Sequence, residues 1–278
     1  MGLDWTTLCN GVAASRLPAD DRSAALGDGL FETLLVRNGQ CVWLDAHLQR
    51  LANGCARLGL DFPGNDLRCE ISSLLRAMQH CEYAVLRITL GRKSAGARGY
   101  APVSRESNRM LQMAEIAKPD RRYWTSGIRA YLCQTRLPES VATAGLKHNN
   151  RLAHVLARAE RPPTAFQEGL MLSHSGLLVE GISSNVFLVI DGVLHTPILA
   201  SAGVEGITRD HILATAQVLG IPLRQRHLQL NDIYRAQELF FCNSLFGIWP
   251  VRALDCLQYS GFDISRKLQS ELEPLWYA

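Results

Sequence analysis

Lysine residues and long apolar stretches are scarce in this sequence. The 278 residues include 29 lysines and arginines, but only four are lysines: Lys93, Lys118, Lys147 and Lys267. No apolar stretch approaches the roughly 20 residues that a membrane-spanning helix needs. The first residues also lack the basic start and apolar core of a secretory signal. We therefore expect a cytoplasmic protein without a membrane partner.

Several functional motifs are also missing. The eight cysteines form no C-x-x-C pair and lie in apolar segments, which is typical of free thiols in a reducing compartment. The eight histidines show no metal-ligand spacing, and no G-x-S-x-G motif is present. The net charge of +3 is small, and no basic stretch alternates with aromatic residues. We expect no metal and no nucleic-acid partner, so any anionic ligand must be bound by individually placed arginines.

The length of the chain and one polar segment predict two domains. A chain of 278 residues suits one large or two ordinary domains, each with its own core. Residues 118–122 are polar, contain a proline and lie near the midpoint, as domain linkers often do. We therefore expect a smaller α/β domain at residues 1–117, the linker at 118–122, and a larger domain at 123–278 that carries Lys147.

Hydrophobic periodicity predicts the main elements. In the first half we expect strands at residues 30–36, 83–90 and 110–117, with one helix between Asp45 and Gly59 and a second at about 65–78. Asp45 is expected to cap the first of these helices and Gly59 to end it. In the second half we expect a strand at 128–133, a three-strand meander at 169–173, 177–180 and 185–190, and a final helix from Asp263. The helix after Lys147 is expected to bury Leu152, Val155, Leu156 and Ala159.

Lys147 is the residue that most calls for a chemical explanation. Arginine is the usual cation of this chain, and only an amine can lose its proton and attack a carbonyl. Lysine is also the residue that forms Schiff bases with carbonyl substrates and pyridoxal phosphate. Taken alone, Lys147 could equally be a solvated residue at the start of a helix.

Two further features predict a site for an anionic, nitrogen-containing ligand. The glycine-flanked loop at residues 203–209 precedes a helix, where backbone N–H groups and the helix dipole favour an anion. Glu180 ends an apolar run, and a buried carboxylate needs a partner. That partner could be a protonated ring nitrogen or an internal arginine, and the loop could simply be a tight turn.

Three more polar residues are candidates for ligand contacts. Arg50 flanks the apolar stripe of its helix, where it can reach solvent or turn inward to an anion. Asn243 and Ser244 follow the apolar residues 239–242, and the end of a buried strand is a common place both for ligand contacts and for plain turns.

Together and in this order, these residues resemble the fold type IV family of pyridoxal-phosphate enzymes. That family includes branched-chain and D-amino-acid aminotransferases and 4-amino-4-deoxychorismate lyase. The matching segments are residues 27–29, residues 31–33, His47 with Arg50, Lys147, Glu180 with Asn185 and Phe187, residues 206–209, and Asn243–Ser244 ahead of Pro250–Val251. Because they span nearly the whole chain, the resemblance implies the α+β, two-domain D-amino acid aminotransferase-like architecture and a homodimer.

The resemblance implies a role for each matching position. Lys147 would bind pyridoxal 5′-phosphate covalently and then move protons, and Glu180 would keep the pyridine nitrogen protonated. The expected phosphate ligands are Arg50, the backbone at Ile207 and Thr208, and Ser244, with Asn243 in the same cofactor site. Arg151 occupies the position where aminotransferase relatives have a tyrosine near the ring hydroxyl, so that contact departs from their pattern.

Two short segments resemble the lyase branch of this family. They are Leu-Lys-His-Asn-Asn-Arg-Leu at residues 146–152 and Arg98-Gly99-Tyr100 after a glycine-rich loop. The implied small-molecule substrate is aminodeoxychorismate, and the products are 4-aminobenzoate and pyruvate, as in folate biosynthesis. Thr33 would pass a proton to the leaving group, and Arg98 with Tyr100 would contact the substrate.

Three alternatives to the lyase remain open at this point. The first is an aminotransferase for D-amino or branched-chain acids, because residues 31–33 are shared with those enzymes. The second is a protein that binds the cofactor without turnover. The third keeps the fold but binds no cofactor.

Overall fold

The computed structural model describes residues 3–14, 16–18, 21–96 and 99–276, and its chain divides into two compact units. The first comprises residues 1–118 together with 147–150, and the second comprises residues 119–146 and 151–278. The sequence led us to expect Lys147 in the C-terminal domain, whereas the structure groups this lysine with the first unit. None of the described helices has the length and apolarity that crossing a membrane requires.

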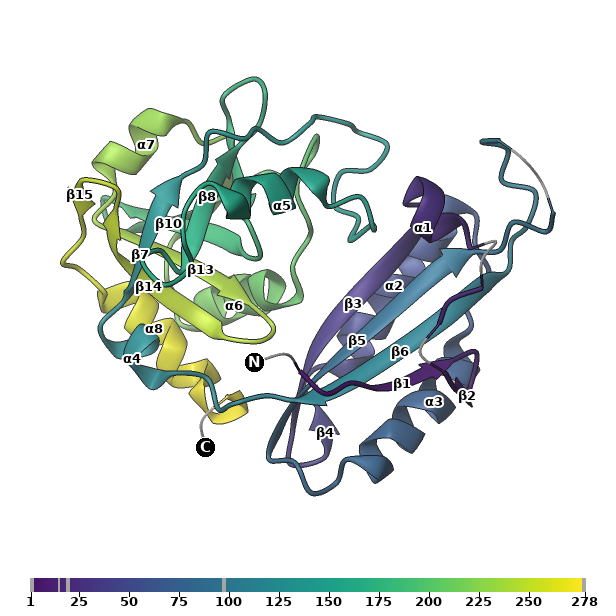
Figure 1. Ribbon diagram of the computed structural model, residues 1–278. Coiled ribbons are helices and arrows are strands. Elements are labelled where there is room, and N and C mark those ends of the chain that lie inside the picture. The colour runs from purple at the N-terminus through teal and green to yellow at the C-terminus, as the bar shows by residue number, and fades with distance from the viewer. Residues whose placement is uncertain (1–2, 15, 19–20, 97–98, 277–278) are drawn as a thin grey trace. The chain divides into compact units, whose positions relative to one another are not determined.

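The first unit is built on an antiparallel sheet of six strands in the order β2-β1-β6-β5-β3-β4 (Figure 1). The strands are β1 (Thr6–Cys9), β2 (Val12–Ala13), β3 (Gly29–Arg37), β4 (Gln40–Cys41), β5 (Tyr83–Arg92) and β6 (Ser107–Glu115). The helices are α1 (Arg22–Leu26), α2 (Leu44–Leu58) and α3 (Gly64–Ala77). The long strands that periodicity predicts near residues 30–36, 83–90 and 110–117 are therefore confirmed.

Helices α2 and α3 cover one face of this sheet and form the core with it (Figure 1). Leu48 and Leu51 of α2 and Leu67 and Ile71 of α3 are buried against strand residues such as Leu34. Because side chains alternate along a strand, every second residue of β3 faces these helices. The burial of two amphipathic helices on one apolar sheet face is what holds the first unit together.

The two ends of α2 differ in how well the sequence predicts them. Gly59 ends the helix in the left-handed conformation at φ 64°, as expected. Asp45 is not the cap, because the helix starts one residue earlier and Trp43, at φ 54°, occupies the cap position without a side-chain hydrogen bond. Asp45 lies in the first turn instead, where its charge still favours the helix dipole.

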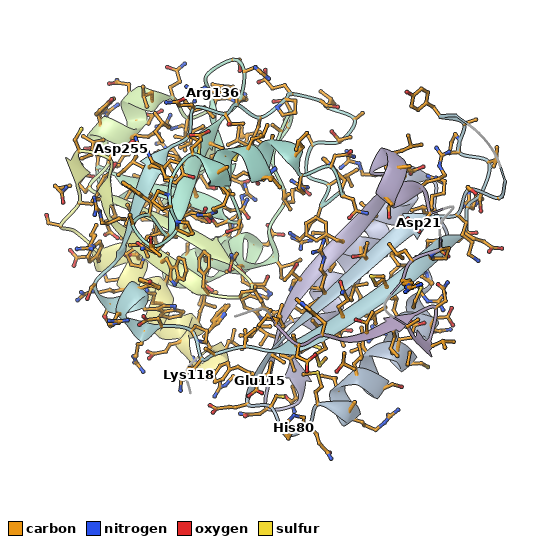
Figure 2. The ribbon with its side chains drawn as sticks, in the orientation of Figure 1. Asp21, His80, Glu115, Lys118, Arg136 and Asp255 are labelled. Atoms are coloured by element: carbon orange, nitrogen blue, oxygen red, sulfur yellow. The ribbon has the colours of Figure 1, made fainter. Side chains whose placement is uncertain are left out.

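Asp21, labelled in Figure 2, ties α1 to the sheet. Its carboxylate accepts a hydrogen bond of 2.8 Å from the backbone N–H of Ser23, which caps the helix. The other carboxylate oxygen accepts from the amide of Asn108 on β6, also at 2.8 Å. The short helix α1 is thus positioned by buried polar side chains, Asp21 at its cap and Arg22 within it, and not by an apolar face.

The second unit contains a mixed sheet of nine strands, in the order β12-β11-β10-β13-β14-β7-β8-β9, with β15 paired to β14. The strands are β7 (Ile128–Leu132), β8 (Glu168–Leu172), β9 (Leu178–Gly181), β10 (Asn185–Ile190), β11 (Val193–Pro197), β12 (Leu223–Arg226), β13 (Glu238–Asn243), β14 (Gly247–Leu254) and β15 (Leu257–Gln258). Strand β7 runs parallel to both β8 and β14. The fold is therefore α+β, as the sequence predicts.

The expected meander of β8, β9 and β10 is wrong, although the three strands themselves exist. Strand β9 pairs with β8, whereas β10 pairs with β11 and β13. The reason lies in Glu168, which is fully buried and accepts hydrogen bonds of 2.7 and 2.9 Å from the hydroxyls of Ser183 and Ser184. This anchor bends the chain after Gly181, so that β10 leaves the ladder of β8 and β9.

The helices of the second unit are α4 (Arg121–Thr125), α5 (Leu152–Ala159), α6 (Ile207–Val218), α7 (Leu230–Arg235) and α8 (Asp263–Leu272), followed by the 3₁₀ turn η1 (Glu273–Leu275). The final helix begins at Asp263, as predicted. Its first turn is capped by another strand, since Glu238 of β13 accepts from the N–H groups of Ile264 and Ser265 at 2.8 and 2.9 Å.

The predicted buried face of α5 is wrong. Leu152, Val155 and Leu156 are 71%, 61% and 54% exposed, and Ala159 is also exposed. The helix packs through its small residues instead, with Ala157 fully buried against the core cluster that contains Tyr131. The Tyr131 hydroxyl donates to the Ala157 carbonyl at 2.6 Å. Small side chains allow this close approach, which the larger apolar residues on the other face would prevent.

Candidate active site

Lys147 is held by β3, a strand inside the first unit's sheet. The N–H of Phe31 donates to the Lys147 carbonyl at 2.9 Å, and the N–H of Asn149 donates to the Gly29 carbonyl at 3.1 Å. A Cβ at Gly29 would lie 2.1 Å from the Leu90 carbonyl oxygen and 2.7 Å from the amide of Asn149. Glycine is therefore required where residues 147–150 pair with β3, and this pairing is why Lys147 belongs to the first unit.

The Lys147 side chain extends over the ring of Phe31. Its Nζ lies 4.2 Å from the ring centroid, within the range of a cation–π interaction. Thr33 is two residues from Phe31 on β3, so both point to the same face of the sheet. The structure thus places Thr33 on the sheet face that meets Lys147. Its catalytic role stays a prediction.

Arg87 adds a second cation to this face and was not among the residues singled out from the sequence. Its guanidinium lies 5.3 Å from the centroid of the Phe31 ring, and its position on β5 is directly opposite Thr33. One signal in the sequence could have revealed it. In the sequence, Arg87 stands between the apolar residues Leu86 and Ile88 of the expected strand at 83–90, and in the structure both neighbours are buried while Arg87 is exposed.

Arg50 forms a buried ion-pair cluster with Glu32 and His47 on the other face of β3. Its Nε and Nη2 donate to the two carboxylate oxygens of Glu32 at 2.8 and 2.6 Å, and His47 Nδ1 lies 2.7 Å from the same carboxylate. Glu32 is 1% exposed and His47 is 0% exposed. The sequence predicts a phosphate role for Arg50 but gave no sign that a strand carboxylate holds its guanidinium in place.

The charges in this cluster follow from its surroundings. Burial alone raises the pKa of Glu32, but the Arg50 guanidinium and the hydrogen bonds from His47 and Arg50 outweigh it and bring the pKa to about 2. Burial lowers the pKa of His47, more than Glu32 raises it. Glu32 is therefore an anion at neutral pH, and His47 is a neutral donor that uses its Nδ1 hydrogen.

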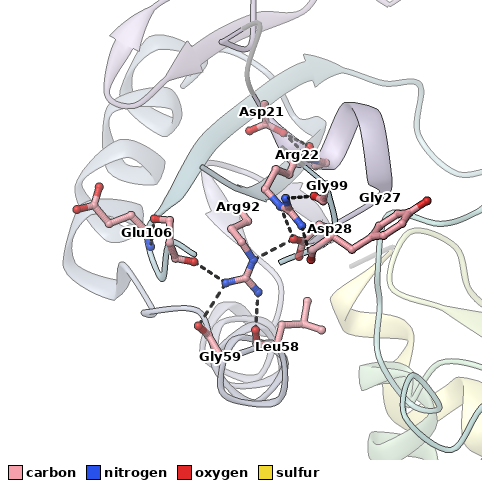
Figure 3. Close-up of polar contacts among 12 residues, drawn as sticks. Asp21, Arg22, Gly27, Asp28, Leu58, Gly59, Arg92, Gly99 and Glu106 are labelled. Atoms are coloured by element: carbon pink, nitrogen blue, oxygen red, sulfur yellow. Dashed lines mark hydrogen bonds and ion pairs between the residues drawn. The ribbon is translucent and has the colours of Figure 1, made fainter. Parts of the chain in front are cut away.

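A second network fixes the turn at Gly27–Gly29 (Figure 3). One oxygen of Asp28 accepts from the Nε atoms of both Arg22 and Arg92, each at 2.9 Å. Arg22 also donates to the carbonyls of Gly99 and Tyr100, at 2.9 and 3.0 Å. The network therefore joins the turn before β3 to the loop in which the sequence predicts substrate contacts.

Of the two substrate-binding residues predicted in that loop, the structure describes only one. Arg98 lies outside the described residues. The side chain of Tyr100 is described and is 87% exposed, while its backbone is held by Arg22. Both substrate roles remain predictions.

In the second unit, Glu180 is a buried carboxylate with two donors. It is 3% exposed, its Oε1 lies 3.1 Å from His154 Nε2, and its Oε2 accepts from the N–H of Val204 at 2.8 Å. An internal arginine was one partner that the sequence left open. Among the described residues, the ion-pair partner of Glu180 is instead His154. The sequence did not single out His154, although its position in the helix that follows Lys147 and Arg151 offered a signal.

The loop at residues 203–206 requires both of its glycines. Gly203 has φ +90°, and a Cβ there would lie 2.8 Å from Val179 and 3.3 Å from the Glu180 carboxylate. A Cβ at Gly206 would lie only 1.8 Å from Oδ1 of Asn185. The glycines thus permit a close approach of this loop to Glu180 and to Asn185.

The same loop leads into α6, whose N-terminus carries no side-chain cap. Gly206 is the cap residue, so the N–H groups of Ile207 and Thr208 in the first turn have no intrahelical acceptor. The hydroxyls of Thr208 and Ser244 lie 3.5 Å apart. The structure therefore brings together three of the predicted phosphate ligands, and backbone N–H groups with hydroxyls are suitable donors for an anion.

Asn243 and Arg151 have structural partners of their own. The Asn243 amide donates to the Ser183 carbonyl at 3.0 Å, and its oxygen accepts from the N–H groups of Leu245 and Phe246 at 2.9 Å each. The geometry of Asn243 is therefore that of a turn. Arg151 donates to the Leu146 carbonyl at 3.1 Å, and its Nη1 lies 3.4 Å from His154 Nε2. Cofactor roles for both residues stay predictions.

Comparison with known proteins supplies the family. The profile of the family described as Amino-transferase class IV matches residues 29–254. Aminodeoxychorismate lyase of Vibrio harveyi is 32% identical to this chain over 95% of it and 98% of the relative. The crystal structure of 4-amino-4-deoxychorismate lyase from Pseudomonas aeruginosa superposes with a TM-score of 0.89 at 42% identity, over 96% of this chain and 98% of the other. A putative branched-chain-amino-acid aminotransferase of Methanocaldococcus jannaschii is 30% identical over 84% of this chain and 81% of the relative. The chain belongs to the class IV aminotransferase family.

Proposed function

We propose that this protein is a 4-amino-4-deoxychorismate lyase that uses pyridoxal 5′-phosphate to form 4-aminobenzoate and pyruvate, a reaction of folate biosynthesis. The observation that carries the proposal is the 42% identity to the Pseudomonas aeruginosa lyase over 96% of this chain. The Vibrio harveyi relative bears the same activity in its name and also matches almost end to end. The lysine segment at residues 146–152 supports the same branch of the family.

Each unit, taken by itself, offers side chains that suit a part of this cofactor. The N-terminus of α6 and the hydroxyls of Thr208 and Ser244 suit its phosphate, because they offer donors without a competing side-chain cap. The buried carboxylate of Glu180 suits its ring nitrogen, and the amine of Lys147 suits its aldehyde. We include Arg50 among the phosphate ligands, with its guanidinium oriented by Glu32.

The proposed chemistry divides between the cofactor and six side chains. When bound, pyridoxal phosphate supplies a ring that accepts electrons from the carbon bearing the substrate nitrogen. Lys147 removes the proton from that carbon as a general base, and Glu180 keeps the ring nitrogen protonated. Thr33 passes a proton to the oxygen of the enolpyruvyl group as its carbon–oxygen bond breaks. Arg98 and Tyr100 bind the substrate, and Arg151 lies near the ring hydroxyl.

We also propose that the protein is a cytoplasmic homodimer. The described cysteines are all free thiols, which suits a reducing compartment. The exposed apolar residues Leu152, Val155 and Leu156 of α5 suit a subunit contact, because such patches on soluble proteins commonly mark interfaces. Sedimentation analysis of the purified protein tests the dimer, and a monomer at micromolar concentration would exclude it.

Product analysis tests the proposed activity. Purified protein supplied with aminodeoxychorismate alone should release 4-aminobenzoate and pyruvate in equal amounts, because elimination needs no second substrate. The alternative is an aminotransferase, favoured by the match to the Methanocaldococcus jannaschii relative. That enzyme would form no pyruvate from aminodeoxychorismate and would require a keto acid as amino acceptor.

A further inference from the structure

We propose that His154 is a positioning residue that orients the Glu180 carboxylate and keeps the shared proton on the cofactor's ring nitrogen. The inference rests on the proposed function, because it assumes that Glu180 meets that nitrogen. It adds a residue that the sequence did not mark and assigns it a physical task.

The geometry around Glu180 shows why one orientation is fixed. His154 contacts Oε1 at 3.1 Å from one side, while the N–H of Val204 contacts Oε2 at 2.8 Å from another. Each oxygen therefore has one donor in the protein, and each keeps a further lone pair for a ligand. With a donor on both oxygens, the carboxylate plane cannot rotate without breaking a hydrogen bond in a buried site.

The hydrogen of His154 can be assigned from its partner. Nε2 has two polar neighbours: the Glu180 carboxylate at 3.1 Å, which can only accept, and Arg151 Nη1 at 3.4 Å, which can only donate. We assign the hydrogen to Nε2 on the shorter of these contacts, so that it bonds to Glu180. Nδ1 is buried and has no hydrogen-bond partner among the described residues. The guanidinium of Arg151, with Nη1 3.4 Å from Nε2, already supplies a positive charge here. The task of His154 is therefore hydrogen bonding, which a neutral donor of the same reach can perform.

This hydrogen bond bears on where the cofactor's proton resides. Hydrogen bonds donated to a carboxylate favour its ionised form, and a proton shared with a ring nitrogen then stays on the nitrogen. A protonated ring is the better electron acceptor, so Lys147 can remove the substrate proton more readily. At metal sites, residues that orient a ligand commonly change affinity or activity by about 10- to 100-fold, and we expect His154 to act on Glu180 in the same manner.

The residues that pack around Glu180 leave little room for another hydrogen-bond donor to its carboxylate. A Cβ at Gly203 would lie 3.3 Å from Oε2, so the loop already approaches that oxygen as closely as a backbone can. Among the described residues, His154 of α5 is the hydrogen-bond partner of Oε1. Removal of the imidazole would therefore leave Oε1 without its donor from the protein.

Three variants test the inference. His154→Leu removes the donor while keeping an apolar side chain, and His154→Gln keeps an N–H donor of similar reach. His174→Leu is the matched control, because His174 is exposed. The first measurement is the dissociation constant for pyridoxal phosphate, from quenching of protein fluorescence. The second is the ¹⁵N chemical shift of cofactor labelled at the ring nitrogen, which reports directly on its protonation.

We expect His154→Leu to weaken cofactor binding about 10-fold, as loss of a hydrogen bond to a charged group does, and to move the ¹⁵N shift toward that of unprotonated pyridine. His154→Gln and His174→Leu should keep the wild-type shift. If the leucine variant does not fold, His154→Asn replaces it, because the shorter amide cannot reach Oε1. An unchanged ¹⁵N shift in a folded variant without the donor refutes the role of His154. Failure of the wild-type protein to bind pyridoxal phosphate would instead refute the proposed function.

Discussion

Replacing Glu32 with glutamine tests the buried charge cluster of the first unit. The carboxylate is 1% exposed and is bonded by Arg50 at 2.8 and 2.6 Å and by His47 at 2.7 Å. Burial acts to raise its pKa, but Arg50 and His47 hold the pKa at about 2, below the ordinary value of 4.5. The variant keeps the size of the side chain, removes its charge, and replaces one acceptor oxygen with an NH₂ group that faces the N–H donors of Arg50 or His47.

The magnitude follows from the two pKa values. A carboxyl whose pKa falls from 4.5 to about 2 on folding contributes roughly 3 kcal/mol to the free energy of unfolding. Since the folded pKa is the lower one, this stability is present above pH 4.5 and is lost as the pH falls through 2. Between pH 7 and pH 3, about 2 kcal/mol of it should disappear. Glutamine does not titrate, so the Glu32→Gln variant lacks this part of the pH dependence.

Two measurements check this reasoning. Urea unfolding should show the variant about 3 kcal/mol less stable at pH 7, with the difference about 2 kcal/mol smaller at pH 3. Carboxyl ¹³C NMR of the wild-type protein should show Glu32 titrating near pH 2. Glu271→Gln is the control, because Glu271 is exposed and its loss should change stability by less than about 0.5 kcal/mol. A Glu32 signal that titrates near pH 4.5, or a stability difference that does not vary with pH, would show the account to be wrong.

Three further predictions concern the candidate site and its support. Lys147→Arg should abolish activity while keeping the charge, and borohydride reduction with cofactor should label wild-type Lys147 but nothing in the variant, as peptide mass spectrometry can establish. Gly206→Ala should lower the melting temperature and weaken phosphate binding, because the added Cβ would lie 1.8 Å from Oδ1 of Asn185. Gly261→Ala is the control: its Cβ would meet only ordinary contacts of 3.4 Å or more, so this variant should behave as wild type. Glu168→Gln should cost about 3 kcal/mol in chemical denaturation, because it leaves a charged partner of a fully buried carboxylate unpaired; an unchanged midpoint would argue against the anchor described here.

Helices and strands whose apolar residue pattern reflects local burial were predictable from the sequence. The strand at 185–190 is confirmed to the residue, because all six of its side chains are buried. The stop of α2 at Gly59 was predictable for a local reason, since a left-handed residue there favours glycine. In both cases the information lies within a few neighbouring residues.

Features that depend on distant partners were not predictable. The apolar residues of α5 suggested a buried face, but the packing of Ala157 against Tyr131 decided which side turns inward. The pairing of β10 depends on Glu168, which precedes it by two strands and holds the intervening turn. A helix of eight residues and a four-residue strand carry too little pattern to specify such choices.

In the candidate site, too, locally encoded residues were predictable from the sequence and their distant partners were not. The sequence marked Lys147 and Glu180, because a rare lysine and a carboxylate after an apolar run stand out locally. It did not reveal that Glu32 holds Arg50 or that His154 contacts Glu180, because each pair joins elements that only the fold brings together. A local signal can thus identify a reactive group, while the residues that orient it emerge from tertiary structure.

The pairing of residues 147–150 with β3 also has an evolutionary consequence. The polypeptide passes from one unit to the other at the bonds 118–119, 146–147 and 150–151. A gene fragment ending at codon 118 would lack the partner that completes the edge of β3 at Phe31. A single crossover at codon 118 would therefore separate β3 from the segment that pairs with it, so an exchange of the first unit as a whole requires three crossover points.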